Sequence, residues 1–271
     1  MISSKLIAIS LGAAQAFWCA ASIEQSTPVS GGASSGFVKT ASNGTLPQTP
    51  GPEAVPLTAE MRGDIFMAEK RFREAAEMYR DNAKNSAVML NKTGIAYHQL
   101  LQVDMAEKYY KLAIRADSKY AEPVNNLGTV YYYRKSYRRA VNEYKRAIRL
   151  EPQAASMWSN LALAYFSRND IEHAREAFQT AVKLDPEVFE HHGTQGVLLQ
   201  ESGVGDRSRF HFYLAQTYAK AGRVELALQY IRKALEEGFK ERKKFQEDPA
   251  FAEMKELPAF KELMASEPRV L

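Results

Sequence analysis

The sequence predicts an all-α fold, a solenoid of helical hairpins stacked side by side. One observation is internal similarity, because three stretches carry the same residue types at the same positions: 91–118, 125–152 and 159–186. A second is the spacing of the small residues that set this alignment. Gly94, Gly128 and Ala162 are 128 − 94 = 34 and 162 − 128 = 34 residues apart. A period of about 34 residues is typical of helical solenoids, whose units bury their apolar faces only against neighbours.

Each unit reads as two helices. In the middle stretch, Gly128 and Tyr131 are spaced to share one face of a first helix. A second helix carries a small–aromatic–small face: Ala140, Tyr144 and Ala147. The small residues allow the two helices to approach closely, and the aromatic ring fills the space between them. Pro152 ends the second helix, because proline lacks an amide donor and restricts the residue before it.

This unit resembles the tetratricopeptide repeat family. Eight positions of one copy match the family signature: Trp158, Leu161, Ala162, Tyr165, Ala174, Phe178, Ala181 and Pro186. A later copy fits as well: Leu214, Ala215, Tyr218, Ala227, Ile231 and Ala234. The resemblance covers about two thirds of the chain. It implies a right-handed α-solenoid of about five hairpins with a short helical C-terminal cap, and a role in protein–protein interaction.

A first copy is weaker. It contains Gly63, Phe66, Ala75 and Tyr79, but Gly63 lies only 94 − 63 = 31 residues before Gly94. We expect the turn that leaves this copy to be short or irregular.

The beginning of the chain reads as a leader. Residues 6–21 are mostly apolar or small, and 21 − 6 + 1 = 16 residues fall short of the about 20 that span a bilayer. We expect a signal peptide over 1–21, with cleavage after Ala21, and hence a periplasmic or extracellular protein. An uncleaved membrane anchor and lipidation of Cys19 are the alternatives. Cys19 is the only cysteine, so cleavage leaves no thiol for disulfides or catalysis.

The next segment, 22–56, is rich in Ser, Thr, Gly and Pro and is expected to be a disordered linker. It contains the pattern G-x-S-x-G at 32–36, but the strand and helix that a hydrolase nucleophile requires are not predicted there. The remaining boundaries follow from the repeats: repeats one to four at 57–186, a loop insertion at 187–207, repeat five at 208–241 and a cap at 242–271.

Two features mark the end of the repeats. Asp206 is placed to cap the N-terminus of the helix of repeat five. Pro249 and Pro258 each open a short helix that offers an aromatic ring, Phe251 and Phe260, to cover the last hairpin. This ending is similar to the tails of many bacterial tetratricopeptide proteins, which favours a bacterial origin.

The chain shows no catalytic constellation. His98 and His173 lack acidic or cysteine partners at metal-ligand spacing, and the only cluster is Glu190-His191-His192, whose adjacent side chains would point apart. H-E-x-x-H, P-loop and Rossmann motifs are absent from the sequence. We therefore expect no enzyme activity, no metal and no cofactor. The rival hypothesis is a metal-dependent hydrolase with a site in the 187–207 loop around His191 and His192.

The net charge is +4, but one repeat concentrates basic residues: Arg134, Lys135, Arg138, Arg139, Lys145, Arg146 and Arg149. Neighbouring tyrosines make nucleic-acid binding conceivable. Acidic residues elsewhere nearly balance the charge, so we expect no nucleic-acid partner. An acidic protein or anionic lipid is the stronger alternative to a solvated surface.

In the tetratricopeptide family the first helix of each repeat lines a concave groove. The resemblance therefore implies a set of candidate binding residues: Asn91, Ile95, His98, Asn125, Asn126, Thr129, Tyr132, Tyr133, Ser159, Asn160, Leu163, Phe166, Phe212 and Gln216. The alternative for each is packing against the next hairpin. Amides and aromatic rings suit a peptide with apolar anchors.

The predicted function is a non-enzymatic scaffold that binds a protein or peptide in this groove. Two alternatives remain open, the hydrolase described above and a self-assembling structural factor of the cell envelope.

Overall fold

The computed structural model describes residues 56–190 and 206–266, and all elements within these ranges are helical. The helices described below belong to one unit, Thr58–Leu271. The predicted signal peptide, the linker up to residue 55 and most of the 187–207 loop lie outside the described residues. Within the described ranges, no helix is both long and apolar enough to cross a membrane.

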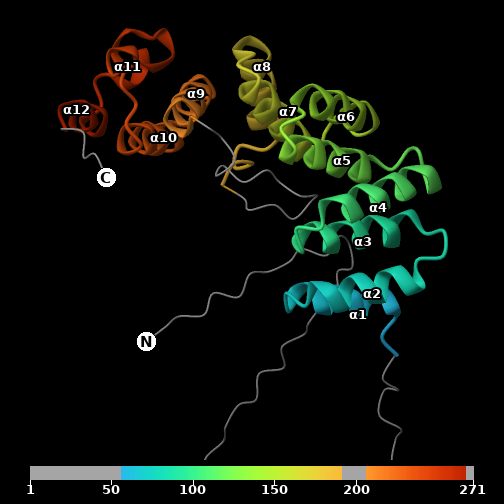
Figure 1. Ribbon diagram of the computed structural model, residues 1–271. Helices are drawn as coiled ribbons and strands as arrows, with labels where there is room; N and C mark the ends of the chain where they lie inside the picture. The colour runs from blue at the N-terminus through green and yellow to red at the C-terminus, as the bar shows by residue number, and fades with distance from the viewer. Residues whose placement is uncertain (1–55, 191–205, 267–271) are drawn as a thin grey trace, which may run out of the picture. The chain divides into compact units, whose positions relative to one another are not determined.

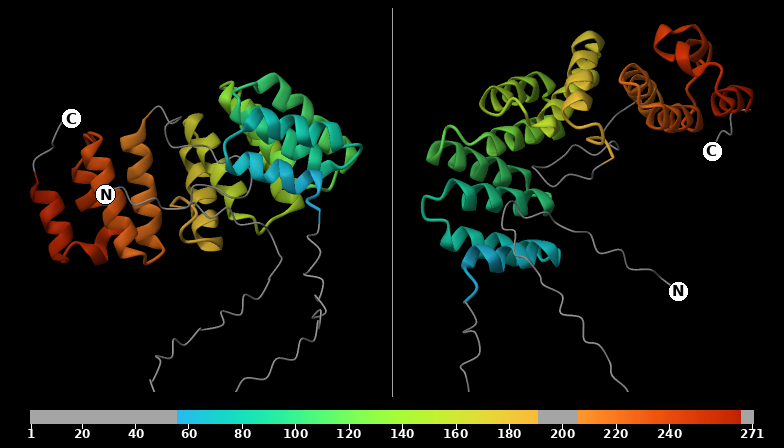
Figure 2. Two further views of the ribbon diagram at one scale, coloured as in Figure 1. Left: turned by 90° about the horizontal axis from the view of Figure 1, so that it is seen from below. Right: turned by 180° about the vertical axis from the view of Figure 1, so that it is seen from behind.

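Five antiparallel hairpins, which we number repeats one to five, make up most of the described fold (Figure 1). Their helices are α1 (Ala59–Ala68) and α2 (Phe72–Asn82), α3 (Ala87–Gln99) and α4 (Val103–Ala116), α5 (Ala121–Tyr133) and α6 (Tyr137–Leu150), α7 (Ala155–Ser167) and α8 (Ile171–Leu184), and α9 (Arg207–Lys220) and α10 (Val224–Glu236). The second helix of each hairpin packs against the first helix of the next, as the right view of Figure 2 shows for α2 to α7. The predicted all-α solenoid of hairpins is confirmed.

The helices begin where side chains satisfy their free amide groups. Thr58 accepts a hydrogen bond from the Met61 amide, and Ser86 accepts one from the Met89 amide. Asp206 caps α9 by accepting from the Arg209 amide at 3.0 Å, as predicted.

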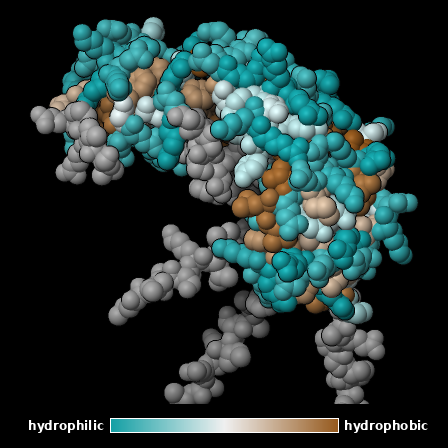
Figure 3. Space-filling model, viewed as in Figure 1, coloured by the Kyte–Doolittle hydropathy of each residue, from teal (hydrophilic) through white to brown (hydrophobic). Residues whose placement is uncertain are grey.

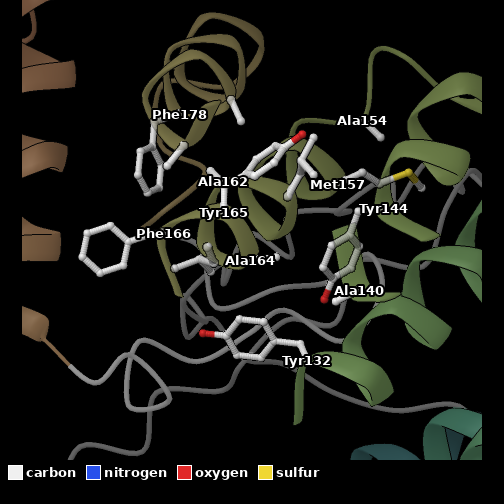
Figure 4. Close-up of a cluster of buried hydrophobic side chains, with 14 of the residues drawn as sticks. Tyr132, Ala140, Tyr144, Ala154, Met157, Ala162, Ala164, Tyr165, Phe166 and Phe178 are labelled. Carbon is white, nitrogen blue, oxygen red and sulfur yellow. The ribbon is translucent and has the colours of Figure 1, made fainter. Parts of the chain in front are cut away.

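Close contact between the two helices of a hairpin depends on the small residue of the first. A Cβ added to Gly63, Gly94 or Gly128 would lie 2.3, 2.5 or 2.7 Å from the ring of a tyrosine of the second helix. Those tyrosines are Tyr79, Tyr110 and Tyr144. Where the small residue is alanine, in repeats four and five, the opposite position holds Phe178 and Ile231. Figure 4 shows Ala162 and Ala164 among the rings of Tyr165, Phe166 and Phe178.

Repeat one confirms the expected irregular exit turn, but this turn is not shortened. The turn from α2 to α3 spans residues 83–86, as long as the turn between α4 and α5 at 117–120. The missing residues come from the helix, since α2 has 11 residues and α4, α6 and α8 have 14. The difference, 14 − 11 = 3, equals the shortfall of 34 − 31 = 3 in spacing. The first repeat is therefore short by almost one helical turn, and its exit turn is irregular, because Lys84 adopts a left-handed conformation with φ 45°.

The turn inside each hairpin places one residue in the left-handed region of backbone conformation. The series, seven positions after each small residue, is Lys70 (φ 59°), Leu101 (φ 59°), Lys135 (φ 57°), Asn169 (φ 60°) and Gly222 (φ 69°). This conformation costs a residue with a side chain about 1–2 kcal/mol. Only repeat five uses glycine at this position.

The C-terminal cap consists of α11 (Lys243–Glu247), the 3₁₀ helix η2 (Pro249–Met254) and α12 (Pro258–Ala265). Pro249 and Pro258 open their helices, and Phe251 and Phe260 are buried, as predicted. η2 packs on α9, and α12 on α10.

Candidate functional site

The candidate binding residues lie on the first helices α3, α5, α7 and α9, as the repeat register predicts. Their low exposure to solvent differs from what a binding groove would require. Twelve of the fourteen are buried: Asn91, His98, Asn125, Asn126, Thr129, Tyr132, Ser159, Asn160, Leu163, Phe166, Phe212 and Gln216. Ile95 is half-buried, and Tyr133 is 57 % exposed. Whether these residues bind a partner stays a prediction, but their contacts within the chain are defined.

Four of the buried amides link the first helices of repeats two, three and four. The Asn126 side chain donates to Asn91 Oδ1 at 3.1 Å, and the Asn160 side chain donates to Asn125 Oδ1 at the same distance. We call this set the asparagine ladder. It fixes α5 against α3 and α7 against α5 with one equivalent bond at each step.

Aromatic residues of the same helices continue the contacts. Tyr132 on α5 forms a hydrogen bond of 2.7 Å with Ser167 on α7, and burial raises the pKa of its phenol. The Phe166 ring on α7 meets Phe210 at 5.7 Å and Tyr213 at 6.1 Å, both on α9 and edge-on. These pairs bury apolar area between successive repeats.

In repeat five, the candidate residues contact the cap. The Phe212 ring stacks on Phe239 at 4.7 Å and meets Phe245 edge-on at 5.2 Å. The Gln216 amide donates to Asp248 just before η2. The cap therefore covers both side chains, as a further hairpin would.

His98 is the one buried histidine among the candidates. Its exposure is 9 %, and its Nδ1 atom has no hydrogen-bond partner among the described residues. Burial lowers the pKa of this imidazole, so the ring is held in its neutral form.

The basic residues of repeat three are largely engaged with neighbouring side chains. Arg134 binds Asp104 and Glu107 of α4. The Arg139 guanidinium lies 4.1 Å from the centre of the Tyr131 ring and donates to its hydroxyl at 3.2 Å. The Arg134 contacts join repeats two and three, and the Arg139 contacts lie within repeat three. Both engage part of the positive charge of this repeat.

Within the described ranges no group of three or more His, Cys, Asp or Glu side chains is arranged to hold a metal ion. His191 and His192 lie outside those ranges. The expected absence of a metal and of catalytic residues therefore stays a prediction.

Two features escaped the sequence interpretation. The left-handed turn residues are mostly lysine, leucine and asparagine, so glycine did not mark them. The asparagine ladder joins residues 126 − 91 = 35 and 160 − 125 = 35 apart, one more than the period. The sequence contained one signal for these bonds. Asn125 lies one period after Asn91, and Asn126 lies one period before Asn160, so two neighbouring positions of the repeat carry asparagine.

Several solved structures resemble the chain. A crystal structure of MamA is 23 % identical, with 67 % of this chain and 96 % of MamA covered and a TM-score of 0.46. MamA from Desulfovibrio magneticus RS-1 is 20 % identical over 69 % of this chain and 99 % of that one, with a TM-score of 0.46. YrrB, described as a tetratricopeptide protein with an unusual peptide-binding site, is 16 % identical over 68 % and 86 %, with a TM-score of 0.44.

No curated protein matches the sequence. A family model does, over residues 125–188 and 198–240, and its description is tetratricopeptide repeat. These residues include α5 to α10, whose hairpins show the small-residue and aromatic contacts described above. Over these residues the chain is therefore similar to the tetratricopeptide repeat family.

Proposed function

We propose that this protein is a non-enzymatic scaffold that binds a protein or peptide on the first helices of its repeats. The observation that carries the proposal is the asparagine ladder, which sets α3, α5 and α7 side by side at equal steps. Side chains of different repeats then form one continuous surface, and such extended surfaces are what solenoids offer to partners. A peptide can contact several repeats at once.

Exposed side chains at the turns of repeats two and three indicate the kind of partner. Tyr133 is 57 % exposed and Leu101 is 69 % exposed, although both are large and apolar. Arg134, through Asp104 and Glu107, ties these two turns together. Figure 3 shows apolar patches on a face of the molecule that is otherwise mostly hydrophilic.

Two exposed cations, Lys135 and Arg138, follow Tyr133 by two and five residues in the sequence, and neither forms an ion pair among the described residues. Aromatic anchors next to free cations suit an acidic peptide with apolar side chains, because the charges attract it and the rings supply buried area. We therefore propose an acidic segment of a protein as the partner.

The test uses a photo-crosslinking amino acid at position 133 in the native cell. The expected result is a discrete crosslinked protein that is identified and then bound by the purified chain. A matched variant carries the same crosslinker at Asn142, which is exposed on α6, and should capture nothing specific. Equal capture at both positions, or unchanged affinity after Tyr133→Ala, would reject this surface. Tyr133 is preferred to Tyr132 or Phe166 because their burial makes alanine there a change to the core.

We also propose export, on the strength of the apolar segment 6–21 alone. N-terminal sequencing of the protein from its native cell tests this proposal. A mature N-terminus after Ala21 is the expected result, and retention of Met1 in the membrane fraction would favour the uncleaved anchor.

A further inference from the structure

The second helices of repeats two to five carry their charges unevenly. Each buries one side in its hairpin, and four positions spaced four, three and four residues apart lie on the opposite side, which we call the outer row. The outer rows of α4, α6, α8 and α10 are, in order, Asp104, Lys108, Lys111 and Arg115; Arg138, Asn142, Lys145 and Arg149; Glu172, Glu176, Gln179 and Lys183; and Glu225, Gln229, Arg232 and Glu236. All of these residues are exposed.

The outer rows of α4 and α6 are basic, and those of α8 and α10 are not. The row on α4 has three cations and one carboxylate, and the row on α6 has three cations and no carboxylate. The rows on α8 and α10 each have one cation and two carboxylates. Asp104, the one carboxylate of the basic rows, is bound by Arg134 of the next repeat. The positive charge is therefore confined to two neighbouring repeats.

Most cations of the two basic rows have no carboxylate partner. Lys111 pairs with Glu107 of its own helix. Among the described residues, no ion pair is formed by the other five: Lys108, Arg115, Arg138, Lys145 and Arg149. Like charges gathered on one surface raise the local potential, and an anionic partner relieves their mutual repulsion.

A chain of polar contacts holds α4 against the beginning of α6. Glu107 on α4 accepts hydrogen bonds from Lys111 and Arg134. The Tyr131 hydroxyl donates to Glu107 at 3.4 Å, and Arg139 of α6 donates to this hydroxyl at 3.2 Å. The two basic rows therefore belong to one surface, built on the opposite side of the hairpins from the asparagine ladder of the first helices.

The composition of the basic rows favours a flat anionic surface over other polyanions. The rows contain no apolar or aromatic residue, and such residues are the anchors that dominate protein–protein interfaces. The rows also offer no ring on which the bases of a single-stranded nucleic acid could stack. Anionic lipid headgroups need neither feature, because each Lys or Arg near a charged bilayer adds a similar increment of attraction.

From these observations we propose that the outer rows of α4 and α6 form a docking surface for a membrane that contains anionic lipids. This surface is separate from the turn surface around Tyr133. A membrane can therefore hold the second helices while a partner occupies the first helices. Partner capture at position 133 and membrane docking are separate readouts, and either can fail without the other.

The test measures partition of the purified full chain onto vesicles by sedimentation. One set of vesicles is phosphatidylcholine alone, and the other also contains phosphatidylglycerol. The readout is the ratio of the two partition coefficients, because the apolar segment 6–21 can insert into both kinds of vesicle alike. We expect wild-type protein to prefer the anionic vesicles, and added salt should reduce this preference.

The double variant Arg115→Gln, Arg149→Gln should lower the ratio by about tenfold or more. Lys145 is kept because its ammonium lies 5.5 Å from the centre of the Tyr165 ring, and Arg138 is kept with the turn surface. The matched control is Lys183→Gln, Arg232→Gln, which removes the same charge from the outer rows of α8 and α10. It should leave the ratio nearly unchanged. Circular dichroism checks that both variants keep their helices.

Three results would overturn the proposal. One is equal binding of wild-type protein to the two kinds of vesicle. Another is an equal loss in the two double variants, which would assign the effect to net charge alone. The third is binding to duplex DNA or specific capture of a protein at Asn142, in either case without a preference for anionic vesicles, because the surface would then serve another polyanion.

Discussion

Repeats two and three share the same packing of two helices and differ at the residue that meets the buried tyrosine hydroxyl. Both pair a glycine with a buried tyrosine, Gly94 with Tyr110 and Gly128 with Tyr144. In repeat three the tyrosine hydroxyl meets Thr129 at 3.1 Å, but the equivalent residue in repeat two is Ile95. The Tyr110 hydroxyl consequently has no hydrogen-bond partner among the described residues. The same tyrosine position therefore contributes differently to stability in the two repeats. The ring packs against glycine in both, but its hydroxyl group has a hydrogen-bond partner in only one of them.

We expect the largest effect from a substitution that disrupts the contact between glycine and the tyrosine ring, which both repeats share. Gly128→Ala places a methyl group against the Tyr144 ring, where the Cβ would lie at 2.7 Å, so the ring has to move. We expect a loss of about 1–3 kcal/mol in the free energy of unfolding. Chemical denaturation followed by circular dichroism measures it.

A second substitution that partly restores the stability of this variant tests the difference between repeats two and three. Adding Tyr144→Phe recreates the alanine–phenylalanine combination of repeat four and should restore part of the loss. In repeat two, Gly94→Ala with Tyr110→Phe should recover more, because no hydrogen bond is given up there. Equal recovery in both repeats would contradict the assigned role of Thr129.

The next effect isolates the hydroxyl groups. Tyr144→Phe removes the contact with Thr129 and should cost about 1 kcal/mol. Tyr110→Phe removes a buried hydroxyl that lacks a partner and should be neutral or stabilising. Melting temperatures of the two variants, measured side by side, decide the point, and a similar loss for both would refute it.

A smaller effect concerns the turns. Leu101 adopts a left-handed conformation with φ 59° and is 69 % exposed, so Leu101→Gly removes strain without removing core contacts. We expect a gain of about 0.5–1 kcal/mol, after the greater flexibility of glycine in the unfolded chain is counted. Gly222→Leu, at the equivalent position of repeat five, should have the opposite sign. A Leu101→Gly variant that melts lower than wild type would show that the turn is not strained.

The smallest effect depends on pH. The position of Tyr132 in repeat three is held by His98 in repeat two, and burial lowers the pKa of that imidazole below its ordinary value of about 6.5. Between the two values the unfolded chain binds more protons, so stability falls as the pH drops from 7 to 5. His98→Tyr should reduce this slope, and His173→Gln, at an exposed histidine, should serve as its control. A slope that survives His98→Tyr would assign the titration to another group.

The comparison also shows how far the sequence alone could lead. Period and residue type located all five hairpins, the Asp206 cap and the proline-opened helices at the end, because these depend on local spacing. The surroundings of the candidate residues depend on neighbours in space. Asn126 and Asn160 looked like free amides on a groove, and they are bound to residues one repeat away.

Other misses have the same origin. The three residues absent between repeats one and two could be counted, but their removal from α2 and not from the turn is decided by packing. The left-handed conformation of Leu101 could not be predicted from its residue type, because the hairpin imposes a conformation that leucine disfavours.

The phenylalanine rings near the C-terminus have a consequence for how the molecule comes apart. Phe212 touches Phe239, Phe245 and Phe251, and Phe251 touches Phe260 in turn. Amide hydrogens of α9, α10 and the terminal helices should consequently exchange with solvent in one shared opening event, while α1 and the shortened α2 fray on their own and exchange sooner.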